Sequence, residues 1–556
     1  MANTRINPIL RILPGLTDVI FLMPLVFLFA RLDGAKTMLG DGDTGWHIRT
    51  GEWILENGRV PHSDVFSFTK AGEAWFAWEW LWDICFAWVY HHGGLATVVA
   101  ASILVICTTF ALLFRLLRRH CDNALLAGGV TVLTCAASTL HWLARPHLFT
   151  MLFLVILLFI LDRVNDGRLK LLLLLPPLTI LWTNLHGGFL AEFIVLAGCI
   201  AGEIVRAMFV DDSKSRATAL NRAKWFIVIT IICGAATLIN PYTYHLHVHI
   251  AKYFSEPYHV QNIGEYQSIN FHEPAALYLE ALLFLAIISG VWYAARRRNF
   301  TALILMAGWG HLALFAARNV PLFAIIAAPF IAEGCGEMLA SLEKARTAPW
   351  VQRLLSSVRA MAAEFGEMDT VPRVHLVSIS GIALVAVLLA SPSAKGKLKA
   401  EYDPGRYPAT ALQVLRSMPD ARIFADDEWG DYLIYQLYPQ HRVFIDGRSD
   451  FYGQDFEQKY IDLMSAKYDW EEYLQKYNID AIILPPKYAL STAIKESHNW
   501  RVIYDDTIAV VFTAVRRQPE IQQVSTTSGG KNRYPAITKS ARRERVTTAD
   551  KQSKGV

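Results

Sequence analysis

The chain has 556 residues, of which 53% are hydrophobic and 18% are charged, and its formal net charge is +4. This composition excludes an ordinary soluble one-domain enzyme and is typical of an integral membrane protein. The small net charge gives no reason to expect a nucleic-acid partner. All seven cysteines lie between Cys85 and Cys335, in or beside apolar segments, so we expect buried thiols and no disulfide framework.

The first apolar stretch, residues 17–31, follows Arg5 and Arg11 and has no obvious small-residue cleavage site. We expect it to be an uncleaved first span and not a signal peptide. Further stretches that are long enough, or nearly so, to cross a bilayer cover residues 95–114, 124–140, 148–161, 169–182, 190–205, 225–239, 275–294, 301–316, 321–339 and 374–389. These stretches predict a multi-span α-helical membrane domain of about eleven transmembrane helices over residues 1–392.

Lysine and arginine are distributed unevenly between the two sides of this domain. If the N-terminus is cytoplasmic, the short outer loops after the first hold only Arg145, Lys252 and Arg318. Most of the positive charge then lies in the cytoplasmic loops at residues 115–119, 163–170, 206–224, 296–298 and 344–373. A bias of this kind determines topology, so we predict a cytoplasmic N-terminus.

The first outer loop, residues 33–93, carries the motif Gly40-Asp41-Gly42-Asp43-Thr44-Gly45-Trp46-His47. Two carboxylates and an imidazole are thereby held on a glycine-rich turn at a membrane surface. Because like charges a few ångströms apart raise one another's pKa, one of Asp41 and Asp43 is predicted to be poised as a base.

A short amphipathic helix is predicted over residues 44–56. Asp43 is its expected N-cap, His47 falls one turn later on the same side, and Asn57-Gly58 is a stop signal. Capping alone is the alternative role for Asp43.

Several other predicted outer loops bring polar side chains to the ends of spans. They contain Arg145, His147, Asn184, His186 and Arg318. For any single loop, helix-end chemistry is the simpler explanation, because Asn, Gly and Pro punctuate helices. For all of the loops together, one shared site is the more economical explanation.

Residues 73–90 contain five tryptophans, and Glu79 and Asp83 lie four positions apart. This density of tryptophan predicts a helix that lies at the headgroup level or enters the bilayer obliquely. Glu79 is the strongest candidate there for a role in the site, and a solvated carboxylate on the polar side of the helix is the alternative.

The predicted outer segment 240–274 is rich in histidine, tyrosine and acidic residues, among them Tyr242 and Glu265. His245, His247 and His249 alternate, so on a strand they would share one face and could hold zinc or copper. The interspersed tyrosines favour instead a wall that binds a sugar or a headgroup by stacking and hydrogen bonding.

The composition changes after residue 389, and residues 402–515 are predicted to be a soluble α/β domain on the outer side. Expected strands cover residues 422–426, 442–446, 480–484, 500–504 and 508–513, and expected helices lie near 407–418, 430–437, 455–465, 470–477 and 490–497. Asp426, Asp427, Asp446 and Asp450 end or follow strands, but no glycine-rich phosphate loop accompanies them. We therefore predict a structural or acceptor-handling module. The basic tail, residues 518–556, is expected to be disordered and to rest on anionic lipid.

A family resemblance rests on Asp41-Gly-Asp43 in a large first outer loop, on the multi-span body and on the soluble outer domain. It also rests on the strings from Gly42 to Trp53 (GDTGWHIRTGEW) and from Trp182 to Phe189 (WTNLHGGF). Together these features resemble the integral-membrane glycosyltransferases of the GT-C fold, and within them bacterial relatives of the protein-mannosyltransferase and lipid A aminoarabinose-transferase group.

The resemblance implies a bacterial inner-membrane enzyme with its soluble domain in the periplasm and a sugar donor carried on a polyprenyl phosphate. In that family an acidic residue of the first outer loop is the catalytic base or a metal ligand, and here this role falls on Asp43 or Asp41. The sequence departs from the family in lacking a diacidic Asp-Glu pair and a Trp-Trp-Asp motif in the C-terminal domain. The metal is therefore unknown, and the alternatives are no cofactor and Mg²⁺ or Mn²⁺.

The remaining candidate residues divide between two roles. Those expected to hold the donor phosphate are Arg145, His147, His186 and Arg318. Those expected to bind the substrates are His47, Glu79, Asn184, Tyr242, His245 and Glu265. The expected partners are the lipid-linked donor, membrane lipid, and an acceptor that is a glycan, a lipid or a protein.

Two other functions compete with this prediction. A polytopic transporter would carry ionisable residues within its spans and usually an internal repeat. Only Glu192, Glu203 and Glu280 are acidic candidates there, and no repeat is detected. A non-catalytic membrane scaffold that presents the C-terminal domain is the other alternative.

Overall fold

A computed structural model describes residues 11–515 except 298, 346–347 and 368–372, so the predicted basic tail lies outside the described residues. The residues up to Ala514 form one compact unit. The helices before residue 391 are α1 (Leu16–Ala30), α2 (Ala35–Met38), α3 (Asp43–Asn57), α4 (Trp80–His120), α5 (Ala124–Ser138), α6 (His147–Asn165), α7 (Leu175–Leu185), α8 (Leu190–Phe209), α9 (Ser213–Ala236), α10 (His245–Ser255), α11 (Pro257–Asn262), α12 (Ala276–Trp292), α13 (Phe300–Phe315), α14 (Val320–Lys344), α15 (Pro349–Glu367) and α16 (Leu376–Ala390).

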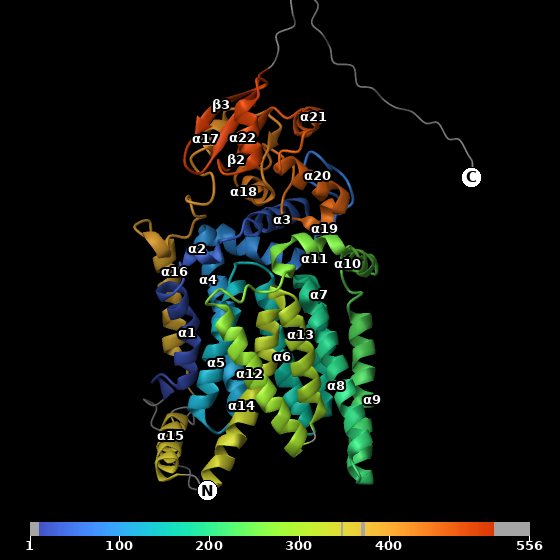
Figure 1. The fold of residues 1–556 in the computed structure, drawn as a ribbon, viewed down its shortest axis with the longest axis vertical. Helices are drawn as coiled ribbons and strands as arrows, with labels where there is room; N and C mark the ends of the chain where they lie inside the picture. The colour runs from blue at the N-terminus through green and yellow to red at the C-terminus, as the bar shows by residue number, and fades with distance from the viewer. Residues whose placement is uncertain (1–10, 298, 346–347, 368–372, 516–556) are drawn as a thin grey trace, which may run out of the picture. The chain divides into compact units, whose positions relative to one another are not determined.

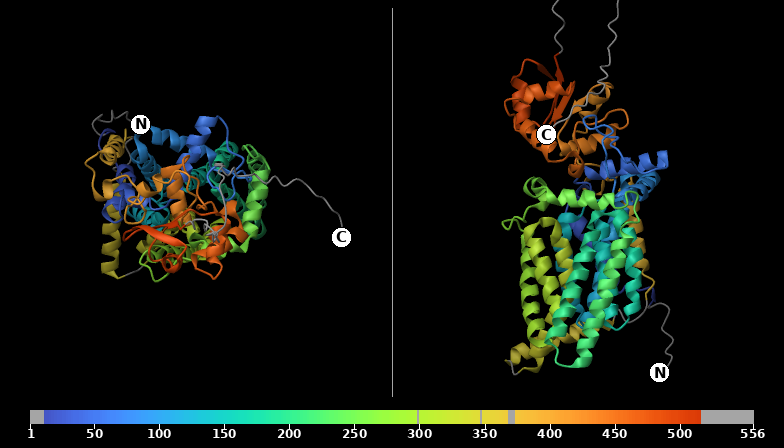
Figure 2. Two further views of the ribbon diagram at one scale, coloured as in Figure 1. Left: turned by 90° about the horizontal axis from the view of Figure 1, so that it is seen from above. Right: turned by 90° about the vertical axis from the view of Figure 1, so that its right-hand side faces the viewer.

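Short 3-10 and π turns connect several of these helices. They are η2 (Thr139–His141), η3 (Leu169–Leu174), η4 (Gly187–Phe189), η5 (Gly264–Tyr266), η6 (Tyr293–Arg297), η7 (Ala317–Asn319) and η8 (Gly396–Leu398). The long helices run side by side, and α3, α10 and α11 lie at one end of the bundle, opposite α15 (Figures 1 and 2).

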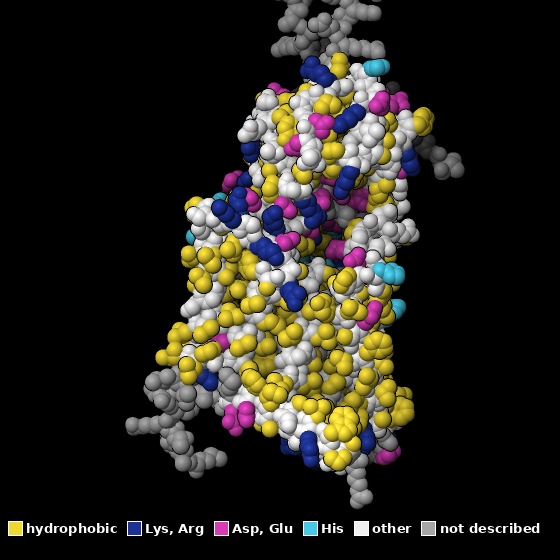
Figure 3. Space-filling view, turned by 60° about the vertical axis from the view of Figure 1, so that its left-hand side comes forward, with side chains coloured by type: hydrophobic (Ala, Val, Ile, Leu, Met, Phe, Trp, Pro, Cys, Tyr) yellow, Lys and Arg dark blue, Asp and Glu magenta, His cyan; other side chains and the backbone are white. Residues whose placement is uncertain are grey.

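The apolar stretches of the sequence all form helices. Helices long and apolar enough to cross a membrane cover residues 80–120, 124–141, 147–165, 187–209, 213–236, 276–297 and 317–344, and shorter apolar helices cover 16–30, 169–185, 300–315 and 376–390. On the face drawn in Figure 3, hydrophobic side chains cover the helical body and charged side chains gather towards its two ends. The prediction of a multi-span helical membrane protein is confirmed.

The tryptophan-rich segment differs from its prediction. Helix α4 begins only at Trp80, and its backbone leaves helical geometry at Gly93 and Gly94. The expected helix over residues 73–79 is absent because this part pairs with the preceding chain: Trp75 N–H donates to the His62 carbonyl over 3.1 Å. The backbone groups that a helix would use are therefore engaged elsewhere.

The C-terminal region forms a four-stranded sheet in the order β1-β2-β4-β3. Its strands are β1 (Ile423–Phe424), β2 (Ala481–Leu484), β3 (Trp500–Asp505) and β4 (Val510–Ala514). Strand β2 pairs parallel to β1 with Ile423 opposite Ala481, and β4 pairs antiparallel to both β2 and β3. Every residue of β2 is buried, as expected for a short apolar central strand.

Six helices surround this sheet. They are α17 (Leu412–Arg416), α18 (Asp427–Leu437), α19 (Ser449–Tyr452), α20 (Gln454–Met464), α21 (Trp470–Lys476) and α22 (Ala489–Glu496). The predicted α/β character is confirmed, but α17 is shorter than its expected range 407–418.

The strand predicted at residues 442–446 is wrong. Val443 forms only isolated bridges, one with Ser67 of the first outer loop and one with Ile423 of β1. Its N–H donates to the Phe66 carbonyl over 3.0 Å, and its carbonyl accepts from Phe68 N–H over 3.0 Å. The extended segment therefore joins the first outer loop to the sheet edge instead of forming a full ladder.

Helix α18 packs against α3 at very close range. A Cβ atom on Gly45 would lie 2.6 Å from Tyr435 Cβ, and one on Gly42 would lie 2.7 Å from Asp431 Cβ. Glycine is required at both positions, because real Cβ atoms do not approach so closely. The glycines of the Asp41–His47 motif thus bring the C-terminal region against the start of α3.

Candidate active site

The two motif aspartates meet a single arginine from another predicted outer loop. Arg145 Nη1 lies 2.7 Å from Asp41 Oδ2, and Nη2 lies 2.5 Å from Asp43 Oδ2. Asp41 Oδ1 also accepts the backbone N–H of Asp43 over 2.8 Å. One guanidinium therefore bridges both carboxylates, a geometry that suits the planar fork of arginine.

The expected N-cap role of Asp43 is wrong. The N-cap of α3 is Gly42, and Asp43 is the first helical residue and makes no side-chain cap. Asp41 stabilises this turn instead, because its side chain accepts the Asp43 N–H. The predicted helix itself is confirmed, and it ends at Gly58 in the left-handed conformation that the Asn57-Gly58 signal predicts.

Burial controls the charge of the Asp43 carboxyl group, whose residue is 8% exposed. Burial and the charge of Asp41 raise the pKa of Asp43 to about 7, although Arg145 opposes the shift. Burial acts against the guanidinium, but Asp41 and Asp43 outweigh it and hold the pKa of Arg145 well above its usual value. The pair is therefore an ionised carboxylate and a fixed cation above neutral pH.

A second group places Glu79 between two imidazoles. His47 Nε2 and His186 Nε2 each lie 3.6 Å from a Glu79 oxygen, and His47 Nδ1 lies 2.7 Å from Asp83 Oδ1. Burial lowers the pKa of His47 well below its usual value and that of His186 to about 3. Burial also raises the pKa of Glu79 to about 8, so the group carries little charge at neutral pH.

Hydrogen bonds indicate which imidazole nitrogens carry protons. His186 Nδ1 accepts Gly188 N–H over 2.9 Å, so in the neutral ring the proton is on Nε2, which faces Glu79. His47 Nδ1 lies 2.7 Å from Asp83 Oδ1, and either atom can carry the proton that they share. Glu79 thus faces the Nε2–H of His186 on one side and His47 on the other.

A second arginine completes the cluster. Arg318, at η7, lies 3.7 Å from Glu265 and stacks over the Tyr266 ring at 4.4 Å from its centroid. Burial favours the neutral form of Glu265, but Arg318 and Arg145 outweigh it and hold its pKa at about 2. The structure therefore brings together eight of the predicted residues: Asp41, Asp43, His47, Glu79, Arg145, His186, Glu265 and Arg318.

Three other predicted residues make internal hydrogen bonds. His147 Nε2 lies 2.6 Å from the His141 carbonyl, although its ring is 6.3 Å from that of His186. Asn184 accepts from the Trp80 indole over 2.8 Å, and the Tyr242 hydroxyl donates to the Pro61 carbonyl over 2.8 Å. The contacts of Asn184 and Tyr242 tie the first outer loop to the ends of the spans, and a direct role of these three residues in binding stays a prediction.

The histidine segment does not have the geometry expected for a metal strand. Residues 245–249 begin helix α10, which puts His245 and His247 on different faces. The His245 side chain is exposed and apart from the cluster, and His249 Nε2 pairs with Asp450 Oδ2 over 2.9 Å. The hydrophobic residues Leu246 and Ile250 are buried, so helical packing prevails over the alternating pattern.

The same side chains show whether a divalent metal ion fits this site. Within the described residues, no group of three or more His, Cys, Asp or Glu side chains is arranged to hold a metal ion. Arg145 already occupies one oxygen of Asp41 and one of Asp43. A divalent cation does not fit between these carboxylates while the guanidinium is in place.

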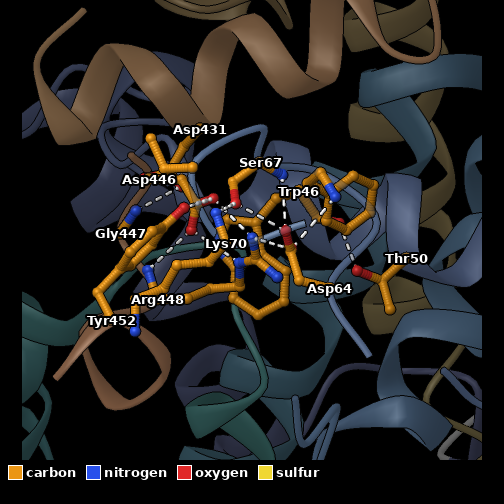
Figure 4. Close-up of polar contacts among 12 residues, drawn as sticks. Trp46, Thr50, Asp64, Ser67, Lys70, Asp431, Asp446, Gly447, Arg448 and Tyr452 are labelled. Atoms are coloured by element: carbon orange, nitrogen blue, oxygen red, sulfur yellow. Dashed lines mark hydrogen bonds and ion pairs between the residues drawn. The ribbon is translucent and has the colours of Figure 1, made fainter. Parts of the chain in front are cut away.

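Sequence reasoning missed the contribution of the C-terminal region. The carboxyl groups of Asp431, on α18, and of Asp43 both lie against Gly447, and Gly447 N–H donates to Asp431 Oδ1 over 2.9 Å. Next to Gly447, the buried Arg448 donates to Asp446 and Asp64 over 2.7 Å (Figure 4). Carboxylates after predicted strands pointed to Asp446, but nothing in the sequence linked Asp431 to the first outer loop.

An apolar pocket lies beside the cluster. It has a volume of about 580 Å³ and is lined by Trp80, Leu81, Pro177, Ile180, Leu181, Asn184, Ile239, Asn240 and Pro241. Trp80 follows Glu79, and Asn184 is two residues from His186, so the pocket adjoins the Glu79–His186 side of the site.

Comparison with known proteins shows the fold. The archaeal oligosaccharyltransferase AglB from Archaeoglobus fulgidus, in complex with an inhibitory peptide and a dolichol-phosphate, is 14% identical, with 91% of this chain and 74% of that chain covered and a TM-score of 0.51. An Archaeoglobus fulgidus oligosaccharyltransferase tethered with an acceptor peptide containing the NVT sequon is 13% identical, with 90% and 74% covered and a TM-score of 0.52.

A third similar structure is ArnT from Cupriavidus metallidurans bound to undecaprenyl phosphate, which is 16% identical, with 90% of this chain and 98% of that chain covered and a TM-score of 0.47. No family model and no curated protein matches the sequence. The predicted GT-C fold is confirmed by the two oligosaccharyltransferase structures.

Proposed function

We propose that this chain is a membrane glycosyltransferase that moves a sugar from a polyprenyl-phosphate-linked donor to an acceptor on the outer face of the membrane. The observation that carries the proposal is the bridge from Arg145 to Asp41 and Asp43, beside an apolar pocket at one end of the helical bundle. The GT-C fold supports the same reaction, because its structural neighbours include an oligosaccharyltransferase in complex with a dolichol-phosphate.

The proposed chemistry needs a base and a phosphate binder. The ionised Asp43 accepts the proton of an acceptor hydroxyl or amine while that group attacks the anomeric carbon. The bond from this carbon to the phosphate oxygen breaks, and the phosphate leaves with the electron pair. A single displacement inverts the anomeric centre, and a positioned base contributes about 10²- to 10⁴-fold to the rate.

Arg145 is suited to link these two steps. Its Nη2 lies 2.5 Å from Asp43 Oδ2. Its Nε is buried and has no hydrogen-bond partner among the described residues. A donor phosphate would compete with the carboxylates for the guanidinium, because phosphate accepts two parallel N–H bonds. The base is then released in the presence of the donor.

The other charged groups complete the proposed donor site. Arg318 and the Nε2–H of His186 are placed to neutralise and hydrogen-bond the leaving phosphate. The apolar pocket beside Trp80 offers a place for the first isoprene units, because its lining contains leucine, isoleucine and proline side chains.

The outer location rests on charge and on substrate supply. Lysine and arginine are concentrated in the loops at the end opposite the site, and by the positive-inside rule this distribution favours an outer location for the site. Nucleotide sugars are made in the cytoplasm, whereas a polyprenyl carrier can present its sugar on the outer face. We therefore propose a bacterial inner-membrane protein with a periplasmic C-terminal domain.

The transporter alternative gains no support from the acids within the spans. Glu192 accepts from Thr179 Oγ1 over 2.9 Å, and Glu203 lies 3.3 Å from Arg222. Both side chains are buried against protein. These contacts brace neighbouring helices and do not line an open path.

The test is binding and transfer by the purified full-length chain. Native mass spectrometry should show a bound polyprenyl phosphate that excess phosphatidylglycerol does not displace. The purified chain should also consume the polyprenyl-phosphate-linked sugars extracted from the source membrane. Free polyprenyl phosphate should be released, and the sugar should be transferred to acceptors in a membrane extract. Failure to bind the carrier and to consume the pool would overturn the proposed function.

A further inference from the structure

The carboxylate of Asp43 is held from two sides. On one side Oδ2 contacts Arg145 over 2.5 Å. On the other side Oδ1 lies against the backbone of Gly447, and the same glycine faces Asp431 Oδ2, so the two carboxyl groups are neighbours there. The second contact comes from the C-terminal region, about 390 positions along the chain.

Two glycines and one backbone hydrogen bond make this second contact possible. A Cβ on Gly447 would lie 2.6 Å from both Asp43 Oδ1 and Asp431 Oδ2, so only glycine leaves room for the two carboxyl groups. The Gly447 N–H orients Asp431 by donating to its Oδ1 over 2.9 Å. Gly42 lets α18 approach the start of α3, because a side chain there would meet Asp431 Cβ at 2.7 Å.

The charges around the pair determine which carboxyl group keeps a proton. Asp43 faces the Arg145 cation, whereas Asp431 faces the carboxylates of Asp43, Asp446 and Asp41. The charge of Asp43 also acts on two further titratable side chains, Tyr402 and Glu79. Two buried carboxylates in contact cannot both ionise at low cost, so the proton resides on Asp431, the partner without a cation.

We propose that Asp431 is a positioning residue: its carboxyl group donates a hydrogen bond to Asp43 Oδ1 and thereby leaves Oδ2 as the oxygen that takes the acceptor proton. The inference rests on the proposed function and deepens it, since the C-terminal region then completes the catalytic site as well as handling an acceptor. Arg448 supports this arrangement by holding the segment at Asp446 to Asp64 of the first outer loop.

The test compares substitutions at Asp431 in the full-length enzyme. Asp431→Ala should lower kcat about 10- to 100-fold with KM for the donor little changed, because a base displaced by about 1 Å loses that much. Asp431→Asn should retain most of kcat, because its amide still donates a hydrogen bond. Gly447→Ala should resemble Asp431→Ala, because its methyl group enters the gap between the carboxyls.

Glu428→Gln is the matched control, because it removes a carboxyl from the same helix that pairs with Arg406 and Tyr407 instead of Asp43. It should keep full activity. Wild-type kcat in Asp431→Ala would overturn the inference, as would equal losses in Asp431→Asn and Asp431→Ala. A loss of kcat that merely follows a fall in the thermal unfolding temperature would also overturn it.

A readout that needs no turnover separates this inference from the proposed function. At neutral pH, the infrared difference between wild type and Asp431→Asn should show a lost protonated carboxyl band. Loss of an ionised carboxylate band instead would overturn the inference even in an active enzyme. If the wild type transfers no sugar, the proposed function fails, and the infrared result still decides whether Asp431 holds the proton.

Discussion

Arg145 Nη2 lies 2.5 Å from Asp43 Oδ2, and this contact occupies the oxygen that a general base would use. The two residues come from separate predicted outer loops, with the rest of α3, then α4, α5 and η2 between them in the chain. A carboxylate in an ion pair is a poor proton acceptor until its partner is drawn away. The guanidinium therefore covers the candidate base, and a competing anion would draw it away.

Asp43→Asn tests the base. It should lower transfer about 10²- to 10⁴-fold, because an amide cannot accept the acceptor proton. Asp41 still pairs with Arg145 and caps the turn, so we expect expression and thermal unfolding to change little. Both are measured on the purified variant.

Asp41→Asn is the matched control for this substitution and should cost less activity. A greater loss at Asp41 would transfer the base role to that residue. Full activity in both variants would contradict the proposed mechanism.

Arg145→Lys tests the phosphate grip. Lysine keeps the charge but loses the two-pronged contact, so KM for the lipid donor should rise about tenfold while the ion pair with Asp43 partly survives. Donor titration at fixed acceptor measures the effect. Arg318→Lys should show a smaller rise, since Arg318 lies 3.7 Å from Glu265 and bridges no second carboxylate among the described residues. An unchanged donor KM in both variants would show that these arginines do not hold the donor phosphate and are only helix-end residues.

The pH dependence of kcat/KM should reflect Asp43. Burial raises its pKa to about 7, and a base must be ionised, so activity should rise with pH through about 7 and then level off. His186 does not contribute to this rise, because burial holds its pKa at about 3 and the ring stays neutral.

Glu79→Gln is the control for the pH profile. Burial raises the pKa of Glu79 to about 8, so its neutral form prevails at neutral pH and glutamine mimics it. The rise near 7 should persist in this variant. Its disappearance would assign the titrating group to Glu79.

Chelation should leave the enzyme active. Arg145 supplies the cation between Asp41 and Asp43, so dialysis against EDTA should not reduce transfer, and added Mn²⁺ should not raise it. Transfer is measured before and after dialysis. A loss restored by Mg²⁺ or Mn²⁺ would show that a metal replaces the guanidinium during turnover.

Topology can be tested with fused reporters. A periplasm-active phosphatase attached after Val515 should be active, and one inserted at Arg297 should be inactive, because positive loops stay in the cytoplasm. The reverse pattern would place the aspartate motif in the cytoplasm and remove the argument for a lipid-linked donor.

The local features of this protein follow from its sequence. Each apolar stretch became a helix because about 20 apolar residues satisfy their backbone only in that form within a membrane. The C-terminal end of α3 follows from its Asn57-Gly58 stop, and the asymmetry of lysine and arginine predicts sidedness. The sequence also named Asp41, Asp43, Arg145 and Glu79 as residues of one site.

Only the tertiary structure decided which of these residues meet, because ion-pair partners and strand pairs depend on packing between distant segments. Residues 245–249 form a helix and not a strand, because the helix buries Leu246 and Ile250 together. The strand predicted at Val443 does not form, because the backbone of this residue pairs with the first outer loop. Asp431 reaches Asp43 only where two helices approach closely enough to require glycine, and no local pattern records so distant a contact.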